Sequence, residues 1–414
     1  MRSTTADGSG AFSDVTFSVP PYAASGQNYV WAVDQTATNA AYQIFTVTNV
    51  GPTATPNPAS SPTPTASTSV TWTPLTACIP SSASLYGVAF NGNGTVIAVG
   101  QGGEIVKSTD DGASWQTINA SSAGSLDLYS VAFADASHAW AGGQSGTLET
   151  SSDGGTTWTP VTVTDSSRTT RYPDIHQTVF TSPSVGYLAG GEFSQVGGST
   201  FEVGEIFRTT DGGTTWNLLS NVPADEQWNS IAFNRAGVGL AVATNGDIIR
   251  TTDGVNWTKV FSQSYPPTLI QLNDVAFTAD GTTAVAVGDN TVLLRSTDAG
   301  GTWASVPAPA GLSDLVYFEG IAFSGSTQGS AVGGTGCSGC TGQTAISTGD
   351  AGANWSTTYG NANVNYLWRI GCDSAVCIAV GDAGTMIVSR GSVPTPTPIP
   401  GLRFRVYLPI VMRC

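Results

Sequence analysis

One pattern recurs along the middle of the chain and constrains its fold more than any other feature. It reads Ser/Thr-x-Asp-x-Gly-x-Thr/Ser-Trp, as in Ser151-Ser-Asp-Gly-Gly-Thr-Thr-Trp158, and one copy is a residue shorter. The aspartates of the copies are Asp110, Asp153, Asp211, Asp253, Asp298 and Asp350. A recurrence of this kind predicts a fold built from repeated supersecondary units.

A second pattern, Val/Ile-Ala-Phe or a close variant, precedes each copy. Its first two phenylalanines, Phe90 and Phe133, are 43 residues apart, which is the length of one four-stranded propeller blade. An Ala-Val-Gly segment such as 98–100 lies between the two patterns. We therefore expect an all-β fold in which each blade has an inner strand, two middle strands and an outer strand after the tryptophan.

A seventh Val-Ala-Phe equivalent, Ile370-Gly-Cys372, has no aspartate pattern after it and no outer strand. Residues 70–75, Val-Thr-Trp-Thr-Pro-Leu, copy the outer strand that follows Trp158. We predict that they supply the missing strand, because closing the ring removes an open sheet edge. The expected fold is a seven-bladed β-propeller over residues 70–392.

Two Pro/Thr-rich segments divide the rest of the chain. Residues 51–69 form a linker, and residues 393–414 form a spacer and C-terminal tail, since such sequences are extended and build no core. Residues 1–50 predict three strands, about 11–19, 28–35 and 41–49, and resemble the final strands of bacterial Ig-like surface domains. Three such strands cannot bury a core alone. Either the chain starts inside a domain, or residues 1–50 pair with another chain.

The composition excludes several classes of partner. The formal net charge is −15, and Lys107 and Lys259 are the only lysines. Phosphate backbones and anionic membranes need clustered positive charge, so we expect no nucleic-acid partner. No apolar run is long enough to cross a membrane, and residues 1–10 are no signal peptide. The low charge and the even number of cysteines nevertheless favour an extracellular or cell-surface protein.

The cysteines favour disulfides over a metal centre. Cys372 and Cys377 flank a short turn in the seventh unit, where a disulfide would compensate for the missing aspartate pattern. Cys337 and Cys340 have metal-type spacing, but a zinc site needs two more ligands and the chain has only two histidines. We therefore expect a second disulfide there, no metal and no cofactor. The partners of Cys78 and Cys414 stay open.

The aspartate pattern is the Asp-box, and residues 70–392 resemble the propellers of the photosystem II assembly and stability factor family. Their units likewise read Val-Phe, then Ala-Val-Gly, then Ser-Thr-Asp-Gly-Gly-x-Thr-Trp. The resemblance implies the fold but not the ligand, because one fold carries many functions. Tyr407-Leu-Pro-Ile-Val-Met-Arg413 after the second spacer resembles the C-terminal ends of exported Chloroflexota-type proteins.

The repeated residues are interpreted as structural. An Asp that occurs in every blade can accept backbone N–H bonds in its turn, and the Trp can pack between blades. Arg208, Arg250 and Arg295 suggest the arginines that hold a carboxylate in sialidases. They occupy one repeat position around the ring, however, and cannot converge on one ligand. We therefore exclude sialidase activity.

The candidate ligand site lies on the face opposite the Asp-boxes. Two residues before each Val-Ala-Phe, the chain has an aromatic or polar residue that should point to the central rim of that face. These residues are Tyr86, Tyr129, His176, Asn229, Asn273, Glu319 and Trp368, and Arg171, Glu192 and Arg369 could join them. The alternative is that the position varies because nothing constrains it.

Two functions follow from this site. The first is a non-catalytic binding or scaffold propeller that recognises a protein or a glycan. The second is a glycoside hydrolase, which needs two carboxylates roughly 5–10 Å apart. Asp174, Glu192 and Glu319 are the carboxylates available on this face, and none lies in a recognised catalytic motif. The sequence therefore favours the binding function.

Overall fold

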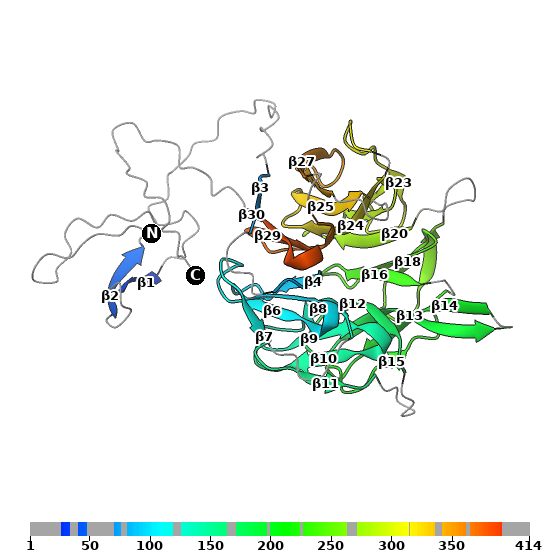
Figure 1. The fold of residues 1–414 in the computed structure, drawn as a ribbon, viewed down its shortest axis with the longest axis horizontal. Helices are drawn as coiled ribbons and strands as arrows, with labels where there is room; N and C mark the ends of the chain where they lie inside the picture. The colour runs from blue at the N-terminus through cyan, green and yellow to red at the C-terminus, as the bar shows by residue number, and fades with distance from the viewer. Residues whose placement is uncertain are drawn as a thin grey trace, which may run out of the picture. The chain divides into compact units, whose positions relative to one another are not determined.

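The computed structural model describes residues 26–33, 40–47, 70–75, 81–118, 126–163, 171–196, 199–223, 227–262, 271–313, 315–335, 342–361 and 365–390. Within them the chain forms seven antiparallel four-stranded sheets and a separate two-stranded sheet. The seven sheets surround a centre, each with its first strand innermost (Figure 1). The prediction of an all-β, seven-bladed β-propeller is confirmed.

The blades follow one another along the chain. Blade 1 comprises β4 (Leu85–Phe90), β5 (Val96–Gly100), β6 (Ile105–Ser108) and β7 (Gln116–Ile118); blade 2 comprises β8 (Leu128–Phe133), β9 (Ala139–Gly143), β10 (Leu148–Ser151) and β11 (Thr159–Val161). Blade 3 comprises β12 (Asp174–Phe180), β13 (Gly186–Val196), β14 (Ser199–Thr209) and β15 (Asn217–Leu218); blade 4 comprises β16 (Trp228–Phe233), β17 (Gly239–Ala243), β18 (Ile248–Thr251) and β19 (Thr258–Phe261).

The remaining three blades complete the ring. Blade 5 comprises β20 (Leu272–Phe277), β21 (Ala284–Gly288), β22 (Leu293–Ser296) and β23 (Ala304–Ser305); blade 6 comprises β24 (Val316–Phe323), β25 (Gly329–Thr335), β26 (Gln343–Thr348) and β27 (Ser356–Asn361). Blade 7 comprises β28 (Leu367–Cys372), β29 (Val376–Gly381), β30 (Met386–Arg390) and β3 (Trp72–Pro74).

The ring closes within blade 7. β3 pairs antiparallel with β30, with Trp72 opposite Ser389 and Pro74 opposite Ile387. Trp72 is 4% exposed and packs in a cluster with Ile370 and Ile387. The sequence segment that precedes blade 1 therefore supplies the outer strand of the last blade, as the copy of the Trp158 segment predicts.

Apolar side chains pack between neighbouring blades. The second strand is buried along its whole length in most blades, as in Val96–Gly100 and Ala284–Gly288. This burial on both faces explains why the second strands read as continuous apolar runs rather than as alternating ones. The Asp-box tryptophans join the same clusters, and Trp115 packs with Ile378 of the preceding blade. Each blade interface is therefore an apolar core of its own.

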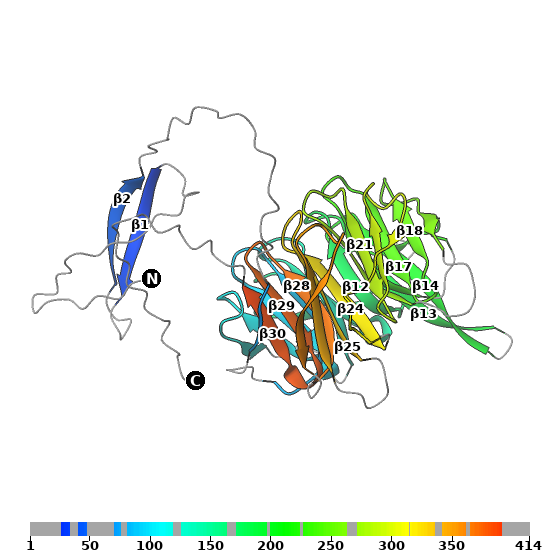
Figure 2. The ribbon, with the colours of Figure 1, turned by 90° about the horizontal axis from the view of Figure 1, so that it is seen from above.

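Blade 3 has much longer middle strands than the other blades. β13 and β14 pair continuously from Gly186 with Thr209 to Val196 with Ser199, and this hairpin extends beyond the neighbouring blades (Figure 2). From the sequence, residues 192–203 are expected to form a long loop between the two middle strands. This expectation is wrong, because strand pairing continues through these residues. This paired extension is called the blade-3 arm below.

The N-terminal part has two described strands, β1 (Gly26–Val33) and β2 (Ala40–Val47), which pair antiparallel. The expected first strand, 11–19, lies outside the described residues, so the Ig-like interpretation of residues 1–50 stays a prediction, as do the boundaries of the linker 51–69 and the tail 393–414. Among the residues with described structure, no helix has the length and apolar character needed to span a bilayer.

Candidate functional site

Backbone hydrogen bonds define the two faces of the propeller. In blades 1, 2, 3, 5 and 6 the Asp-box turn bonds to the turn between the first two strands of the same blade, as in Gly154 N to Ser137 O (2.7 Å). The turn between the middle strands bonds instead to the start of the first strand, as in Gln101 N to Ser84 O (2.8 Å). The Asp-boxes and the starts of the inner strands therefore lie on opposite faces, as the sequence predicts.

The Asp-box carboxylates are held within their own turns. Asp298 Oδ1 accepts hydrogen bonds from Thr302 N (2.9 Å) and Ser296 Oγ (2.7 Å), and these bonds lower the pKa of Asp298 to about 2. Asp110, Asp153, Asp211, Asp253 and Asp350 make equivalent bonds. A carboxylate with all these partners stabilises its turn and is poorly placed for chemistry.

Two of the three arginines of the sialidase comparison connect neighbouring blades. Arg250 Nε donates to Ala299 O (2.9 Å) and Arg295 Nε donates to Ala351 O (2.8 Å), each in the Asp-box of the next blade. Arg208 Nε donates to Tyr187 Oη in its own blade (3.1 Å), and Lys107 Nζ reaches Thr156 Oγ1 (2.8 Å). These four side chains belong to four different blades, and each makes a separate contact.

All seven inner strands have a β-bulge at the same position. The pairing register shifts between the residues on either side of one skipped residue, as at Leu85/Gly87 and Leu128/Ser130. The skipped residues are Tyr86, Tyr129, His176, Asn229, Asn273, Glu319 and Trp368. A bulge re-aims a side chain and is often found next to a functional site. We call these seven residues the bulge ring.

The glycine of the Ala-Val-Gly pattern makes room for the bulge. A Cβ at Gly100 would lie 1.9 Å from Ser84 O, and one at Gly381 would lie 1.8 Å from Tyr366 O. The backbone of Gly100 is extended, with φ −172°, so glycine is needed here for space rather than for its conformational freedom. Blade 4 has Ala243 at this position. The pattern is thus a sequence signal for the bulge, which our sequence interpretation missed.

One part of the bulge ring is aromatic. The ring centroids of Trp368 and Tyr86 are 6.0 Å apart, as are those of Tyr86 and Tyr129. Tyr129 stacks on His176 at 5.4 Å, and His176 also bonds to Gln227. Burial lowers the pKa of His176 to about 4, so this imidazole is neutral at pH 7. Trp368, Tyr86 and Tyr129 are half-buried and form what we call the aromatic arc.

The rest of the bulge ring is polar and hydrogen-bonded. Asn229 Nδ2 donates to Leu272 O (2.8 Å) and Asn273 Nδ2 donates to Phe318 O (3.1 Å), each in the next blade. Tyr366 Oη donates to Glu319 Oε1 (2.8 Å). Burial nevertheless raises the pKa of Glu319 to about 7. This part of the ring therefore contains a carboxyl group that is partly protonated at neutral pH.

A central channel, lined by the inner strands of the blades, contains a buried ion pair next to the bulge ring. Arg369 Nη1 of blade 7 lies 3.1 Å from Asp274 Oδ1 of blade 5. Asp274 also accepts bonds from Ser230 Oγ (2.6 Å) and Ile321 N (2.9 Å). A single carboxylate thus connects blades 4, 5, 6 and 7. Asp274 was not among the sequence candidates, because only the ring geometry brings it to Arg369.

A cavity of 380 Å³ occupies the channel. Its wall includes Arg369, Asp274 and Gln177, and it continues past Ile231 to Arg235 in a first turn of blade 4. It therefore extends from the level of the ion pair toward the Asp-box face. Our sequence interpretation considered only the opposite face and did not anticipate this cavity.

Arg171 and Glu192 lie at the root of the blade-3 arm. Arg171 Nη2 bonds to Glu192 Oε2 (2.6 Å) and also to Glu205 Oε1. Glu205 is 8% exposed, and its burial raises its pKa. Asp174 Oδ1 accepts a bond from Ser145 N of blade 2 (2.6 Å). The structure therefore groups Arg171 with two glutamates and places this group in blade 3, apart from Glu319 in blade 6.

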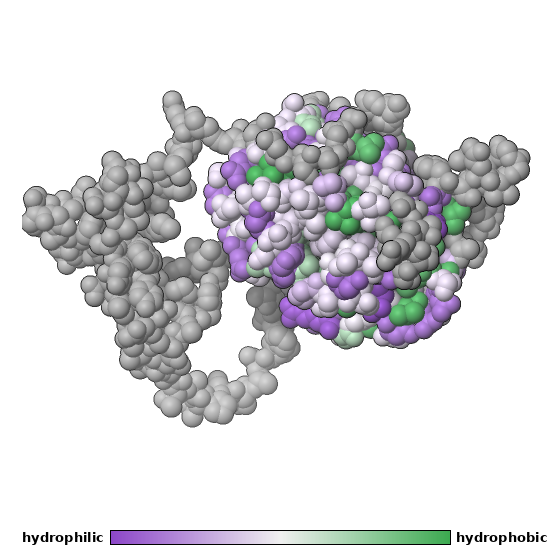
Figure 3. Space-filling view, turned by 90° about the horizontal axis from the view of Figure 1, so that it is seen from below, coloured by the Kyte–Doolittle hydropathy of each residue, from purple (hydrophilic) through white to green (hydrophobic). Residues whose placement is uncertain are grey.

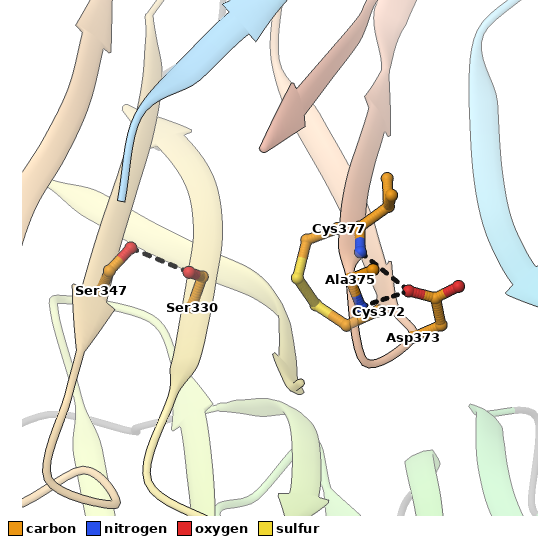
Figure 4. The surroundings of a disulfide bond; sticks show 7 residues. Ser330, Ser347, Cys372, Asp373, Ala375 and Cys377 are labelled. Carbon is orange, nitrogen blue, oxygen red and sulfur yellow. Dashed lines mark hydrogen bonds between the residues drawn. A yellow bond between two sulfur atoms is a disulfide. The ribbon is translucent and has the colours of Figure 1, made fainter. Parts of the chain in front are cut away.

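Cys372 and Cys377 form a disulfide across the first two strands of blade 7 (Figure 4). The turn between them is also held by Asp373 Oδ1, which accepts bonds from Ala375 N and Val376 N (both 2.7 Å). Cys337, Cys340, Cys78 and Cys414 lie outside the described residues. Within the described part of the chain, no group of three His, Cys, Asp or Glu side chains is placed to hold a metal ion.

The chain is similar to known propellers of one assembly-factor family and to other propellers. The sequence model described as "Photosynthesis system II assembly factor YCF48" matches residues 66–194. The structure of YCF48 bound to a D1 peptide superposes with TM-score 0.58 and 16% identity, covering 79% of this chain and 96% of that one.

Two further solved structures show the same fold. YCF48 from Cyanidioschyzon merolae has TM-score 0.58 and 17% identity, covering 77% of this chain and 99% of that one. The WD40 propeller domain of Doa1 has TM-score 0.57 and 12% identity, covering 78% and 98%. No curated protein matches the chain. At these identities the structural likeness supports the fold alone.

Proposed function

We propose that this Asp-box propeller is a non-catalytic binding or scaffold module that holds a segment of a partner protein over its bulge ring. One observation carries the proposal: the backbone bulge is the same in every blade, whereas the side chain that it presents differs from blade to blade. A constant backbone with variable side chains is what a recognition surface needs. The Asp-box face, in contrast, repeats the same side chains in their structural roles.

The relatives agree with a binding role. The family whose sequence model matches residues 66–194 is described as an assembly factor, and a similar solved propeller is described as bound to a D1 peptide. Figure 3 shows only small, separate hydrophobic areas on the side that it displays. The exposed large apolar residues are correspondingly scattered, as Tyr172 and Leu315 illustrate. We therefore expect a short segment at the ring rather than a large apolar interface.

Selection of random displayed peptides on the purified propeller tests this function. The matched variants are a ring variant, Tyr86→Ala with Trp368→Ala, and an Asp-box variant, Asp153→Asn. We expect peptides that bind the wild type and the Asp-box variant equally and bind the ring variant at least tenfold more weakly. Recovery of no ring-dependent peptide contradicts the proposal.

A second candidate function rests on Glu319. Its raised pKa is the property of a general acid in glycoside hydrolysis. The other two carboxylates on this face are engaged, because Glu192 is paired with Arg171 and Asp174 is held by Ser145 N. We therefore favour binding. Hydrolysis of any member of a polysaccharide panel that is lost in Glu319→Gln or Glu192→Gln establishes the enzyme instead.

We also propose that the propeller works outside the cytoplasm. The Cys372–Cys377 disulfide supports this, because disulfides persist in oxidising compartments. Thiol labelling of the native protein before and after reduction, read by mass spectrometry on the peptide that contains both cysteines, tests the bond. Full labelling before reduction contradicts this part of the proposal.

A further inference from the structure

The aromatic arc presents its rings next to carboxylates. Tyr86 lies between Tyr129 and Trp368, with 6.0 Å between the ring centroids on each side. Trp368 is itself supported by Tyr366, whose ring centroid is 4.7 Å away. All of these rings are half-buried, so each keeps an exposed part while its neighbours limit its rotation. The arc is thus a preorganised aromatic surface.

Two aspartates flank Tyr86. Burial raises the pKa of the Tyr86 hydroxyl most, and the negative charges of Asp127 and Asp382 raise it further. Asp382 Oδ1 accepts bonds from Trp368 Nε1 (2.7 Å) and Ser84 Oγ (3.2 Å). Asp127 Oδ1 accepts a bond from Gly102 N (2.8 Å). Hydrogen bonds therefore fix both carboxylates beside the arc.

The cations near this face are engaged elsewhere. Arg369 is paired with Asp274 in the channel, Arg171 with Glu192 and Glu205, and Lys259 with Asp247. Lys107 lies on the other face, at the Thr156 hydroxyl. Among the described residues, no basic side chain forms an ion pair with Asp127 or Asp382. The net charge of −15 adds a long-range attraction for cations.

We propose that the aromatic arc, with Asp127 and Asp382, is a subsite for the cationic side chain, lysine or arginine, of the partner segment. A cation over an aromatic face is attracted by the ring quadrupole, and the two carboxylates supply charge complementarity. A neutral sugar could also stack on the rings, but the flanking carboxylates favour a cation. This inference rests on the proposed function, since it names the chemistry that the bulge ring recognises.

The test measures binding of three synthetic peptides by calorimetry. Their sequence is acetyl-Gly-Pro-Gly-X-Gly-Pro-Gly-amide, with X as lysine, norleucine or glutamate, and cellohexaose is the neutral sugar probe. We expect the lysine peptide to bind at least tenfold more tightly than the norleucine peptide, and the glutamate peptide to show no heat of binding. Tyr86→Leu and Asp127→Asn should each weaken the lysine peptide about tenfold, whereas Tyr86→Phe should retain binding.

Two control variants separate the arc from general charge. Asp111→Asn removes one negative charge on the Asp-box face, where Asn tolerates the observed φ of 55°. Tyr172→Leu removes an aromatic ring that is 63% exposed outside the arc. Both should leave the lysine affinity unchanged, with thermal unfolding showing that every variant is folded.

Four results overturn the inference. The first is that the norleucine peptide binds as tightly as the lysine peptide, and the second is that Asp111→Asn lowers the lysine affinity as much as Asp127→Asn does. The third is binding of cellohexaose, and the fourth is that none of the probes binds. The peptide selection tests the proposed function separately. If it recovers neutral peptides whose binding depends on the bulge ring, the binding function holds even when these results exclude the cationic subsite.

Discussion

The two faces of this propeller differ in what their repetition preserves. On the Asp-box face, backbone and side chain repeat together, and each aspartate bonds within its own turn, as Asp153 does with Thr157 N (2.8 Å). On the opposite face only the backbone bulge repeats, while its side chain is Tyr86 in one blade and Glu319 in another. Repetition of a side chain therefore marks a structural need of every blade, and variation on a constant backbone marks the candidate site.

Blade 7 sharpens this comparison, because it keeps the bulge and lacks the Asp-box. It has two other constraints, the Cys372–Cys377 disulfide and the pairing of β3 with β30. Arg390 Nη2 also donates to Asp111 O in the Asp-box of blade 1 (3.1 Å). Different contacts thus stand where blade 7 lacks the Asp-box, while its bulge-ring residue, Trp368, remains.

The largest effect is expected where the ring closes. Trp72→Ala removes a buried indole from the cluster with Ile370 and Ile387 and should lower the free energy of unfolding by about 3–5 kcal/mol. Denaturant unfolding followed by circular dichroism measures it. Thr73→Ala, on the exposed side of the same strand, should cost less than about 1 kcal/mol, and an equal loss in both variants contradicts the closure role of Trp72.

Removal of the disulfide should have the next effect. The loop closed by Cys372 and Cys377 has a sequence separation of 5, for which the chain-entropy argument gives about 2 kcal/mol. Cys372→Ser with Cys377→Ser should therefore destabilise the propeller by about that amount, and reductant should destabilise the wild type equally. A variant as stable as the oxidised wild type shows that blade 7 needs no compensation for its missing Asp-box.

The Asp-box comparison is tested by Asp153→Ala. The substitution leaves Thr157 N, Thr156 N and Ser151 Oγ without their acceptor and should cost about 1–2 kcal/mol, as for a lost cap. Thermal unfolding measures the loss, and ring-dependent peptide affinity should stay within a factor of two. Loss of affinity without loss of stability would make the Asp-box face the binding site.

The smallest effect is a pH dependence at the bulge ring. Burial raises the pKa of Glu319 to about 7 in the fold, while the unfolded side chain titrates near about 4.3. The folded state thus binds more protons between these values, so stability falls as pH rises through this window and levels off above pH 7. We expect a loss of about 1 kcal/mol after discounting for the partial exposure of the side chain.

Glu319→Gln is the matched control for this titration. The variant keeps an acceptor for the Tyr366 hydroxyl and should lose the decline in stability between pH 4.5 and 7. Unfolding curves measured at half-unit pH intervals compare the two proteins. An unchanged decline in the variant assigns the titration to another carboxyl, such as Asp289, whose pKa burial also raises.

The sequence predicts the fold well because its signals are local. Each signal is defined by a few consecutive residues: the Asp-boxes, the Val-Ala-Phe strands and the copied outer strand at 70–75. Together they predict the seven blades and the closure of the ring. The order of strands in a blade follows from this repeat alone. The residues that the bulges present were also identified, because they hold one fixed position before Val-Ala-Phe.

The contacts of the site could not be predicted in the same way. Asp274 meets Arg369 only through the closed ring, across blades that are separated in sequence, and the repeat pattern carries no information on such pairs. The register of β13 with β14 likewise depends on pairing through residues 192–203, whose Gly and Ser content suggests a loop. The glycine of the Ala-Val-Gly pattern is a sequence signal for the bulge. Its reason is seen only in the structure, where a Cβ at Gly100 would lie 1.9 Å from Ser84 O.

Hydrogen exchange with and without a selected peptide tests the central claim most directly. The account predicts slower exchange at the starts of the inner strands, around Tyr86, Tyr129 and Trp368, with no change at the Asp-box turns around Asp153 and Asp211. Protection of the Asp-box turns with unchanged exchange at the inner-strand starts would contradict the assignment of recognition to the bulge ring.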